Sequence, residues 1–169
     1  MERFIKQMSI YHQYHQKLIT RISHYIGVPL IVFSLMIVLG WLQFGITEVF
    51  TTQLDWLLIA ALVIYYLFFE IVIGLSTGVV LVILNVLAGL IGGISPNWNG
   101  FWIFLVCFAV GWLFQLLGHV VARNKPAFMN NLSQIFIAPF FLVAEIFFRF
   151  GYRKSLRERV HSHPPTTTN

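Results

Sequence analysis

An apolar block of 41 residues, from about Leu54 to Ile94, restricts the folds open to this chain more than any other feature. A helix needs about 20 apolar residues to cross the ~30 Å hydrocarbon core of a membrane, so the block is long enough for two crossings. Two further runs, from about Ile26 to Ile46 and from about Phe101 to Ala122, are each long enough for one crossing. The sequence therefore predicts four membrane-spanning helices.

The boundaries between these helices are predicted from the residues that disfavour helix. We divide the 41-residue block near Gly74 to Gly78, because the segment GLSTG is its weakest helical stretch. The residues from Ser95 to Gly100 form a turn before the fourth span, and Trp98 and Trp102 suit a membrane interface.

The composition excludes several other classes of protein. The chain is 58% hydrophobic and 10% charged, whereas soluble domains carry about a quarter charged residues. A soluble protein of 169 residues could not bury this much apolar surface, so a soluble enzyme and a disordered chain are both excluded. The single cysteine, Cys107, lies in an apolar run and excludes a disulfide framework. The basic residues lack interleaved aromatic side chains, so we expect no nucleic-acid partner.

The first part of the chain, residues 1–25, is expected to form an amphipathic helix. Apolar and aromatic residues recur there at alternating four- and three-residue steps, as on one side of a helix. These residues are Phe4, Met8, Tyr11, His15, Leu18, Ile22 and Tyr25. We expect this helix to lie along the membrane surface or over the ends of the spanning helices of a transmembrane domain at residues 26–150.

The basic residues also predict the topology, because the cytoplasmic loops of membrane proteins are enriched in Lys and Arg. Four crossings place the N-terminus and the segment after the fourth span on one side of the membrane. These two regions hold Arg3, Lys6, Lys17, Arg21, Arg123 and Lys125. Both are therefore expected in the cytoplasm.

The fifth apolar segment, Leu132 to Phe148, has only 17 residues, with Pro139 near its middle and Glu145 near its end. A full crossing would put the basic residues of the C-terminal tail outside the cell, so we predict a kinked, re-entrant or interfacial segment. Residues 151–169 are expected to form a basic, disordered cytoplasmic tail. The predicted fold is all-α, a polytopic membrane helical bundle of four full spans with these two additions.

The histidines are the main candidates for chemistry, because this topology puts all six at the cytoplasmic side. They are His12, His15, His24, His119, His161 and His163. Folding does not require such one-sided clustering, and imidazole is the commonest metal ligand in proteins. Several neutral imidazoles near the inner interface would suit iron or zinc. The alternative is that each histidine is an ordinary interfacial residue, and this is our expectation for the two in the tail.

The spacing of the histidines sets a condition on any shared metal. On one continuous helix, His15 and His24 would point to opposite sides and lie ~13 Å apart along the axis. Both can reach one metal only if the helix breaks or bends between them. His119 stands near the inner end of an apolar helix, where an ionisable group is functional by default.

Two carboxylates also lie within the apolar segments. Glu70 is expected to reach the inner interface from the end of the second span, and Glu145 to pair with Arg149 one turn later. Either could instead orient a ligand histidine through a hydrogen bond.

Two separated signatures resemble the Mpo1-like family of small membrane proteins. The first is YH at 14–15 followed by HYIGVPL at 24–30. The second is GWLFQLLGH at 111–119, followed by KPA at 125–127 and NL at 131–132. Both occur in the family's order with compatible spacing, and the resemblance covers the chain from about residue 9 to residue 145.

The resemblance implies an activity. Characterised fungal members are Fe(II)-dependent dioxygenases of the endoplasmic reticulum that use O₂ to shorten 2-hydroxy fatty acids by one carbon. The same positions here imply His15, His24 and His119 as iron ligands, with no catalytic residue separate from them. His12 is a weaker fourth candidate.

Two arginines are further candidates for this site. Arg21 and Arg123 are candidates to neutralise the carboxylate of the substrate. The chain differs from the family in having Thr20 where Asn is common, and Arg123 near a position where an acidic residue is common. With no retention signal visible, we expect a bacterial cytoplasmic membrane rather than the endoplasmic reticulum.

A non-catalytic membrane protein that binds lipid or a partner helix is the alternative function. In the enzyme, His15, His24 and His119 converge on one point. In the alternative, they lie in separate environments.

Overall fold

The computed structural model describes residues 2–14, 17–45, 51–122 and 133–162. Within these ranges the chain forms seven helices and one two-stranded hairpin. In chain order the elements are α1 (Glu2–Tyr14), α2 (Leu18–Gly40), β1 (Gln43–Gly45), β2 (Thr51–Gln53), α3 (Leu54–Leu67), α4 (Ile71–Gly92), α5 (Trp98–Ala122), α6 (Ser133–Arg149) and α7 (Lys154–Ser162).

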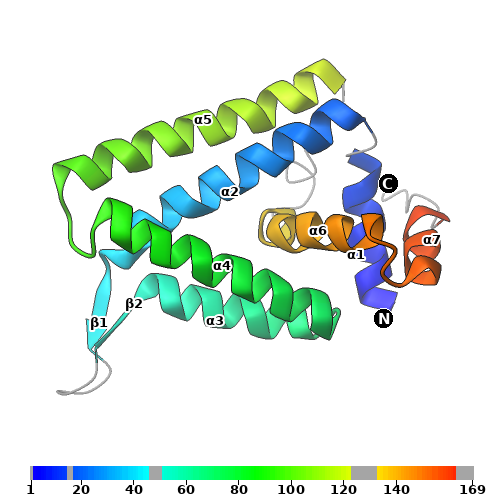
Figure 1. The fold of residues 1–169 in the computed structure, drawn as a ribbon, viewed down its shortest axis with the longest axis horizontal. Coiled ribbons are helices and arrows are strands. Elements are labelled where there is room, and N and C mark those ends of the chain that lie inside the picture. The colour runs from blue at the N-terminus through cyan, green and yellow to red at the C-terminus, as the bar shows by residue number, and fades with distance from the viewer. Residues whose placement is uncertain (1, 15–16, 46–50, 123–132, 163–169) are drawn as a thin grey trace.

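The helices α2, α3, α4 and α5 form an up-and-down bundle, and the other helices gather at one end of it (Figure 1). The hairpin and the α4–α5 connection lie at the opposite end. The start of α2 and the end of α5, which carry His24 and His119, are therefore at the same end as α1, α6 and α7.

Three of the bundle helices are long and apolar enough to cross a membrane. These are α2, α4 and α5, with 23, 22 and 25 residues, or about 33 to 38 Å of helix. Their outward side chains are apolar and exposed, as at Val79, Leu90 and Val106, which suits contact with lipid. The prediction of an all-helical chain is confirmed, and three helices are candidate membrane spans, but the count of four spans is not confirmed. Helix α3 has 14 residues, or only about 21 Å.

The predicted break in the long apolar block is wrong by several residues. The observed break lies between α3 and α4 at residues 68–70, and not at Gly74 to Gly78. Glu70 caps the start of α4, because its carboxylate accepts a hydrogen bond of 2.7 Å from the backbone N–H of Ile73. Gly74 and Gly78 remain helical and let α4 approach α3, where Gly74 packs against the backbone of Tyr66.

Glu70, which we expect to reach the inner interface, has a side chain that is buried within the protein. It is 5% exposed, and the Tyr152 hydroxyl donates a hydrogen bond of 3.2 Å to its carboxylate. Arg153 forms an ion pair of 3.5 Å with the same oxygen. Glu70 thus connects the α3–α4 turn to the α6–α7 turn.

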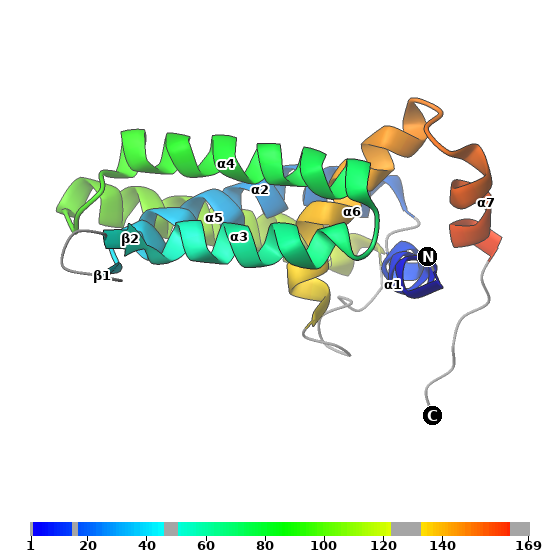
Figure 2. The same cartoon turned by 90° about the horizontal axis from the view of Figure 1, so that it is seen from below.

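The N-terminal helix is divided differently from the prediction. Helix α1 ends at Tyr14, and α2 begins at Leu18, eight residues before the predicted start of the first span. Lys17 precedes α2 in an extended conformation. Helix α1 crosses the end of the bundle instead of continuing α2 (Figures 1 and 2).

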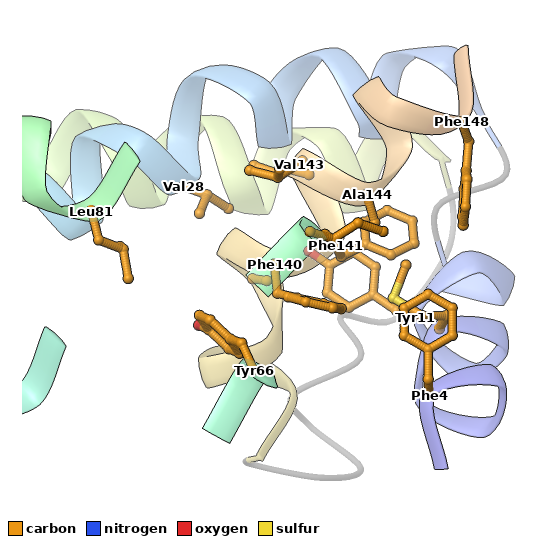
Figure 3. Packing of buried hydrophobic residues seen from close by; sticks show 14 of the residues in the cluster. Phe4, Tyr11, Val28, Tyr66, Leu81, Phe140, Phe141, Val143, Ala144 and Phe148 are labelled. Carbon is orange, nitrogen blue, oxygen red and sulfur yellow. The ribbon is translucent and has the colours of Figure 1, made fainter. Parts of the chain in front are cut away.

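Helix α6 runs obliquely across the end of the bundle (Figure 2). Its buried aromatic side chains meet those of α1 and α3: Phe140 contacts Phe4 and Tyr66, and Phe141 contacts Tyr11 (Figure 3). This cluster ties α1 and α6 to the bundle by burial of apolar surface.

Residues 154–162 were expected to be disordered but form α7. The reason is that Leu156 and Val160, one helical turn apart, are 5% and 3% exposed and belong to the same apolar core. Residues 163–169 lie outside the described part of the chain.

Candidate functional site

Two histidines from distant parts of the sequence face each other inside the bundle. His24 on α2 and His119 on α5 have ring centroids 5.0 Å apart, with the rings nearly perpendicular at 84°. They are 4% and 3% exposed. Two imidazoles in an apolar interior are costly to charge, so their neutral forms are favoured there.

Small residues bring the two histidines together. A methyl group added at Gly27 would lie 2.8 Å from the carbonyl oxygen of Gly111, and one added at Gly118 would overlap the side chain of Ser23. Close approach through glycines is a common way to pack membrane helices. At this spacing, side chains that project from α2 and α5 on the same side of the contact can meet.

Thr20 connects the two helices and orients His24. Its hydroxyl donates a hydrogen bond of 3.2 Å to the carbonyl oxygen of Gly118, and its own carbonyl oxygen lies 2.8 Å from Nδ1 of His24. A carbonyl oxygen can only accept, so Nδ1 of His24 carries the proton and Nε2 carries the lone pair.

An elongated cavity extends from the two histidines into the bundle. The cavity has a volume of about 150 Å³ and is open on one side. Five of its polar residues lie toward the end of the bundle where α1 and α6 lie: Tyr11, His24, Gln115, His119 and Gln134. Apolar side chains of α2, α3 and α6 form most of the remaining wall.

Three polar residues of this cavity were not singled out by the sequence. Gln115 and Gln134 are 8% and 1% exposed, and Tyr11 is 3% exposed. Burial, with a smaller contribution from the charge of Glu145, raises the pKa of Tyr11, so its phenol stays protonated. The signal that could have identified the glutamines is an amide within an otherwise apolar helical segment.

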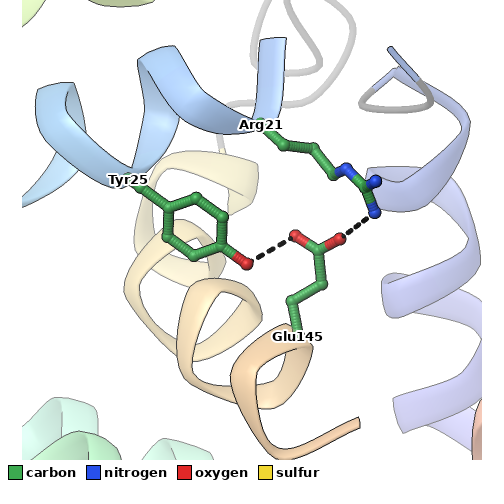
Figure 4. Close-up of polar contacts among 3 residues, drawn as sticks. All are labelled: Arg21, Tyr25 and Glu145. Carbon is green, nitrogen blue, oxygen red and sulfur yellow. Dashed lines mark hydrogen bonds and ion pairs between the residues drawn. The ribbon is translucent and has the colours of Figure 1, made fainter. Parts of the chain in front are cut away.

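Glu145 lies beside this site but has a different partner from the one predicted. Arg21 donates a hydrogen bond of 2.7 Å to one carboxylate oxygen, and the Tyr25 hydroxyl donates one of 3.1 Å to the other (Figure 4). Arg149 instead lies over the ring of Tyr25, 5.9 Å from its centroid. The pairing of Glu145 with Arg149 was therefore wrong, because the N-terminal turns of α2 supply closer partners.

Replacing Glu145 with leucine is expected to lower the free energy of unfolding by ~1–3 kcal/mol, because the charged hydrogen bonds are lost and Arg21 keeps an unpaired charge. Thermal unfolding in detergent, for this variant, for Arg21→Met and for the double variant, measures the effect. The double variant should lose less than the sum of the single losses. Additive losses would show that the ion pair contributes nothing.

The structure locates the other predicted site residues only in part. Arg21 pairs with Glu145 and does not line the cavity. His12 is partly exposed on α1. His15 and Arg123 lie outside the described ranges. Among the residues that the structure describes, no group of three or more His, Cys, Asp or Glu side chains is arranged to hold a metal ion.

The interruption between α1 and α2 bears on the histidine spacing. The sequence required a break or bend between His15 and His24 if both were to reach one metal. Helix α1 ends at Tyr14 and α2 begins at Leu18, with Lys17 extended, so α1 does not continue into α2.

Comparison with known proteins gives two matches. Residues 1–150 match the family described as "2-hydroxy-palmitic acid dioxygenase Mpo1-like". The chain is also 31% identical over 154 residues to "2-hydroxy-palmitic acid dioxygenase MPO1" of Saccharomyces cerevisiae, which covers 89% of this chain and 83% of the yeast protein. No solved structure matches. The chain therefore belongs to the Mpo1-like family.

Proposed function

We propose that the protein is a membrane-embedded, Fe(II)-dependent dioxygenase that uses O₂ to shorten 2-hydroxy fatty acids by one carbon. The yeast relative is named for a 2-hydroxy fatty acid and for dioxygenase activity. One structural observation carries the proposal furthest: the buried pair His24 and His119 lies at the polar end of a long apolar cavity.

The residues at this end suit Fe(II) in two respects. Imidazole is a good ligand for iron, and two imidazoles here are close together in a buried place. Metal-ligating histidines usually donate their other ring N–H to a carbonyl or carboxylate, as His24 does to Thr20. Bound Fe(II) would supply the redox chemistry with O₂ that the protein side chains lack. His15 is the proposed third ligand and His12 a weaker fourth.

The cavity suits the substrate in its polarity. The carboxylate and 2-hydroxyl would lie near the histidines, with Gln115 and Gln134 as hydrogen-bonding groups. The acyl chain would lie along the apolar wall, where its burial contributes ~0.8 kcal/mol per methylene. Arg123 remains the proposed partner of the carboxylate, because the charge of Arg21 is already paired with Glu145.

The proposed orientation puts the histidine end at the cytoplasmic face. The basic residues Arg149, Arg153 and Lys154 are at the same end of the bundle as the histidines. An excess of basic residues is typical of the cytoplasmic side. We place the protein in a bacterial cytoplasmic membrane, with both termini in the cytoplasm.

The test is to measure metal content and turnover on the same sample. The untagged protein is purified in detergent, loaded anaerobically with Fe(II), analysed for iron and zinc, and given a 2-hydroxy long-chain acid with and without O₂. One iron per chain and an acid one carbon shorter, formed only with O₂, are the expected results. Protein that binds no iron and stays inert would instead support the lipid- or partner-binding function.

A further inference from the structure

We propose that the bundle has a second binding site, at the end opposite the histidines, which holds a primary ammonium group. Such a group is present on amino-bearing lipid headgroups and on small soluble amines. The site is a cavity of about 250 Å³ lined by residues of α2, α3 and α4, whereas a single water needs only about 10–15 Å³ of such space. The start of α3 and the end of α4 put it toward the hairpin (Figure 1).

The cavity contains a buried carboxylate. Asp55, in the first turn of α3, is 4% exposed. Its Oδ1 accepts a hydrogen bond of 2.7 Å from the backbone N–H of Trp56. Its Oδ2 lies against Gly40, the last residue of α2, and would be 3.0 Å from a side-chain carbon added there. One oxygen of the carboxylate is therefore satisfied by the start of α3, and the other lies at the end of α2.

The chain supplies no positive charge for this carboxylate. The sequence has no Lys, Arg or His between His24 and His119, and both of these histidines are at the opposite end of the bundle. Helices α2 and α4 end near the cavity, at Gly40 and Gly92, and the C-terminal end of a helix carries a partial negative charge. A buried carboxylate in such surroundings is costly unless a cation pairs with it.

Asn85 provides a second, independent indication of a ligand. It lies on α4, lines the same cavity and is 5% exposed. Its side-chain oxygen has no hydrogen-bond partner in the described part of the chain, although buried polar groups are nearly always paired. A donor bound in the cavity would satisfy it.

The packing of α3 on α4 puts the two acceptors at one level. Gly78 of α4 packs on Val63 of α3, and the two helices are antiparallel. Continued toward the hairpin, this register brings Asp55 to the level of residues 85 and 86. Asp55 and Asn85 therefore approach the cavity from two neighbouring helices.

The lining suits an organic ammonium better than a metal ion. Three side chains with oxygen atoms line the cavity, those of Gln53, Asp55 and Asn85, and apolar residues that include Val86 and Leu90 form much of the rest. Ca²⁺ takes about six to eight oxygen ligands. A primary ammonium has three N–H donors, which suit this small number of acceptors. Its carbon stem would lie against the apolar wall, and its charge would neutralise Asp55.

The experiment compares two lipids that differ in the ammonium of the headgroup. Full-length protein in detergent is mixed with equal amounts of phosphatidylethanolamine and phosphatidylcholine with the same acyl chains, and native mass spectrometry counts the lipids retained. Both ammonium groups are positive, but only that of ethanolamine has N–H donors. One phosphatidylethanolamine should be retained with a preference of about tenfold or more, as expected for a charged hydrogen bond.

Three variants test the residues. Asp55→Asn keeps the size of the side chain, removes its charge and should abolish the preference. Asn85→Leu removes the unpaired amide from an apolar helix, so it should fold, and it should reduce the preference. Glu158→Gln is the matched control, because it also removes one negative charge, but from an exposed position on α7 at the other end of the bundle. It should keep the wild-type preference.

A soluble amine tests the other source of the ammonium. Thermal unfolding is measured in ethylammonium chloride and in sodium chloride at equal concentration. If ethylammonium raises the midpoint of the wild type more than sodium does, but not that of Asp55→Asn, the site binds a soluble amine even where neither lipid is preferred. Equal midpoints in the two salts together with no lipid preference would overturn the proposal. So would a lipid preference that persists in Asp55→Asn.

Discussion

Replacing His119 with alanine is expected to reduce turnover of a 2-hydroxy fatty acid at least 100-fold and to remove most of the bound iron. Loss of a residue that only supports a metal ligand commonly costs 10- to 100-fold, so loss of a ligand should cost more. His24→Ala should have the same effect, because the two rings, one from α2 and one from α5, have centroids only 5.0 Å apart. Iron content and product formation are measured on the same samples.

His161→Ala is the matched control, since His161 stands at the end of α7, far along the chain from the cavity. It should keep the iron content and turnover of the wild type. Thermal unfolding of the iron-free proteins distinguishes a metal ligand from a packing residue. The iron-free His119→Ala variant should unfold near the same temperature as the iron-free wild type, although it binds less iron. Undiminished turnover of His119→Ala would remove that residue from the site.

Replacing Gly111 with valine is expected to have the largest effect on folding. A first side-chain carbon at this position would lie 2.7 Å from a side-chain carbon of Ile31 and 3.0 Å from the carbonyl oxygen of Gly27. The backbone oxygen cannot move without moving α2, so the helices must separate. Such overpacking costs about 1–3 kcal/mol, occasionally more. It should also move His24 away from His119 and lower the iron content of the folded protein.

Gly89→Ala is the control for this substitution. An added methyl group there would meet only Ile94, at an ordinary distance of 3.8 Å. A glycine in the middle of a helix costs roughly 0.5–1 kcal/mol relative to alanine, so Gly89→Ala should raise the thermal midpoint slightly. A Gly111→Val protein with the wild-type midpoint would show that the α2–α5 contact is looser than the structure describes.

The candidate histidines and the predicted partner of Glu145 had different outcomes in the structure. The sequence singled out His24 and His119, and the structure brings their rings to 5.0 Å. The residues alone indicated His119, as an ionisable group in an apolar helix, and the family resemblance implied that His24 joins it; their role as metal ligands stays a prediction. The predicted pairing of Glu145 with Arg149 was wrong because helical spacing indicates only partners within about one turn, whereas Arg21 is 124 positions distant.

The predicted helix boundary in the long apolar block was wrong for a similar reason. The glycines at 74 and 78 predict a break in the helix, although in a close-packed bundle glycine serves equally for contact between helices. The actual break follows from the carboxylate of Glu70, which satisfies a backbone N–H at the start of α4. Whether a glycine breaks a helix or allows two helices to approach can be decided only when its neighbours in space are known.

By itself, the sequence determined that this chain is a helical membrane protein of the Mpo1-like family. Hydropathy is summed over some 20 consecutive residues, so it needs no knowledge of packing. Only the tertiary structure decided which polar groups meet: Thr20 with Gly118, Arg21 with Glu145, and Glu70 with Tyr152. These partners are 82 to 124 positions apart, and their contact depends on how closely the helices approach, which small residues allow and hydropathy does not report.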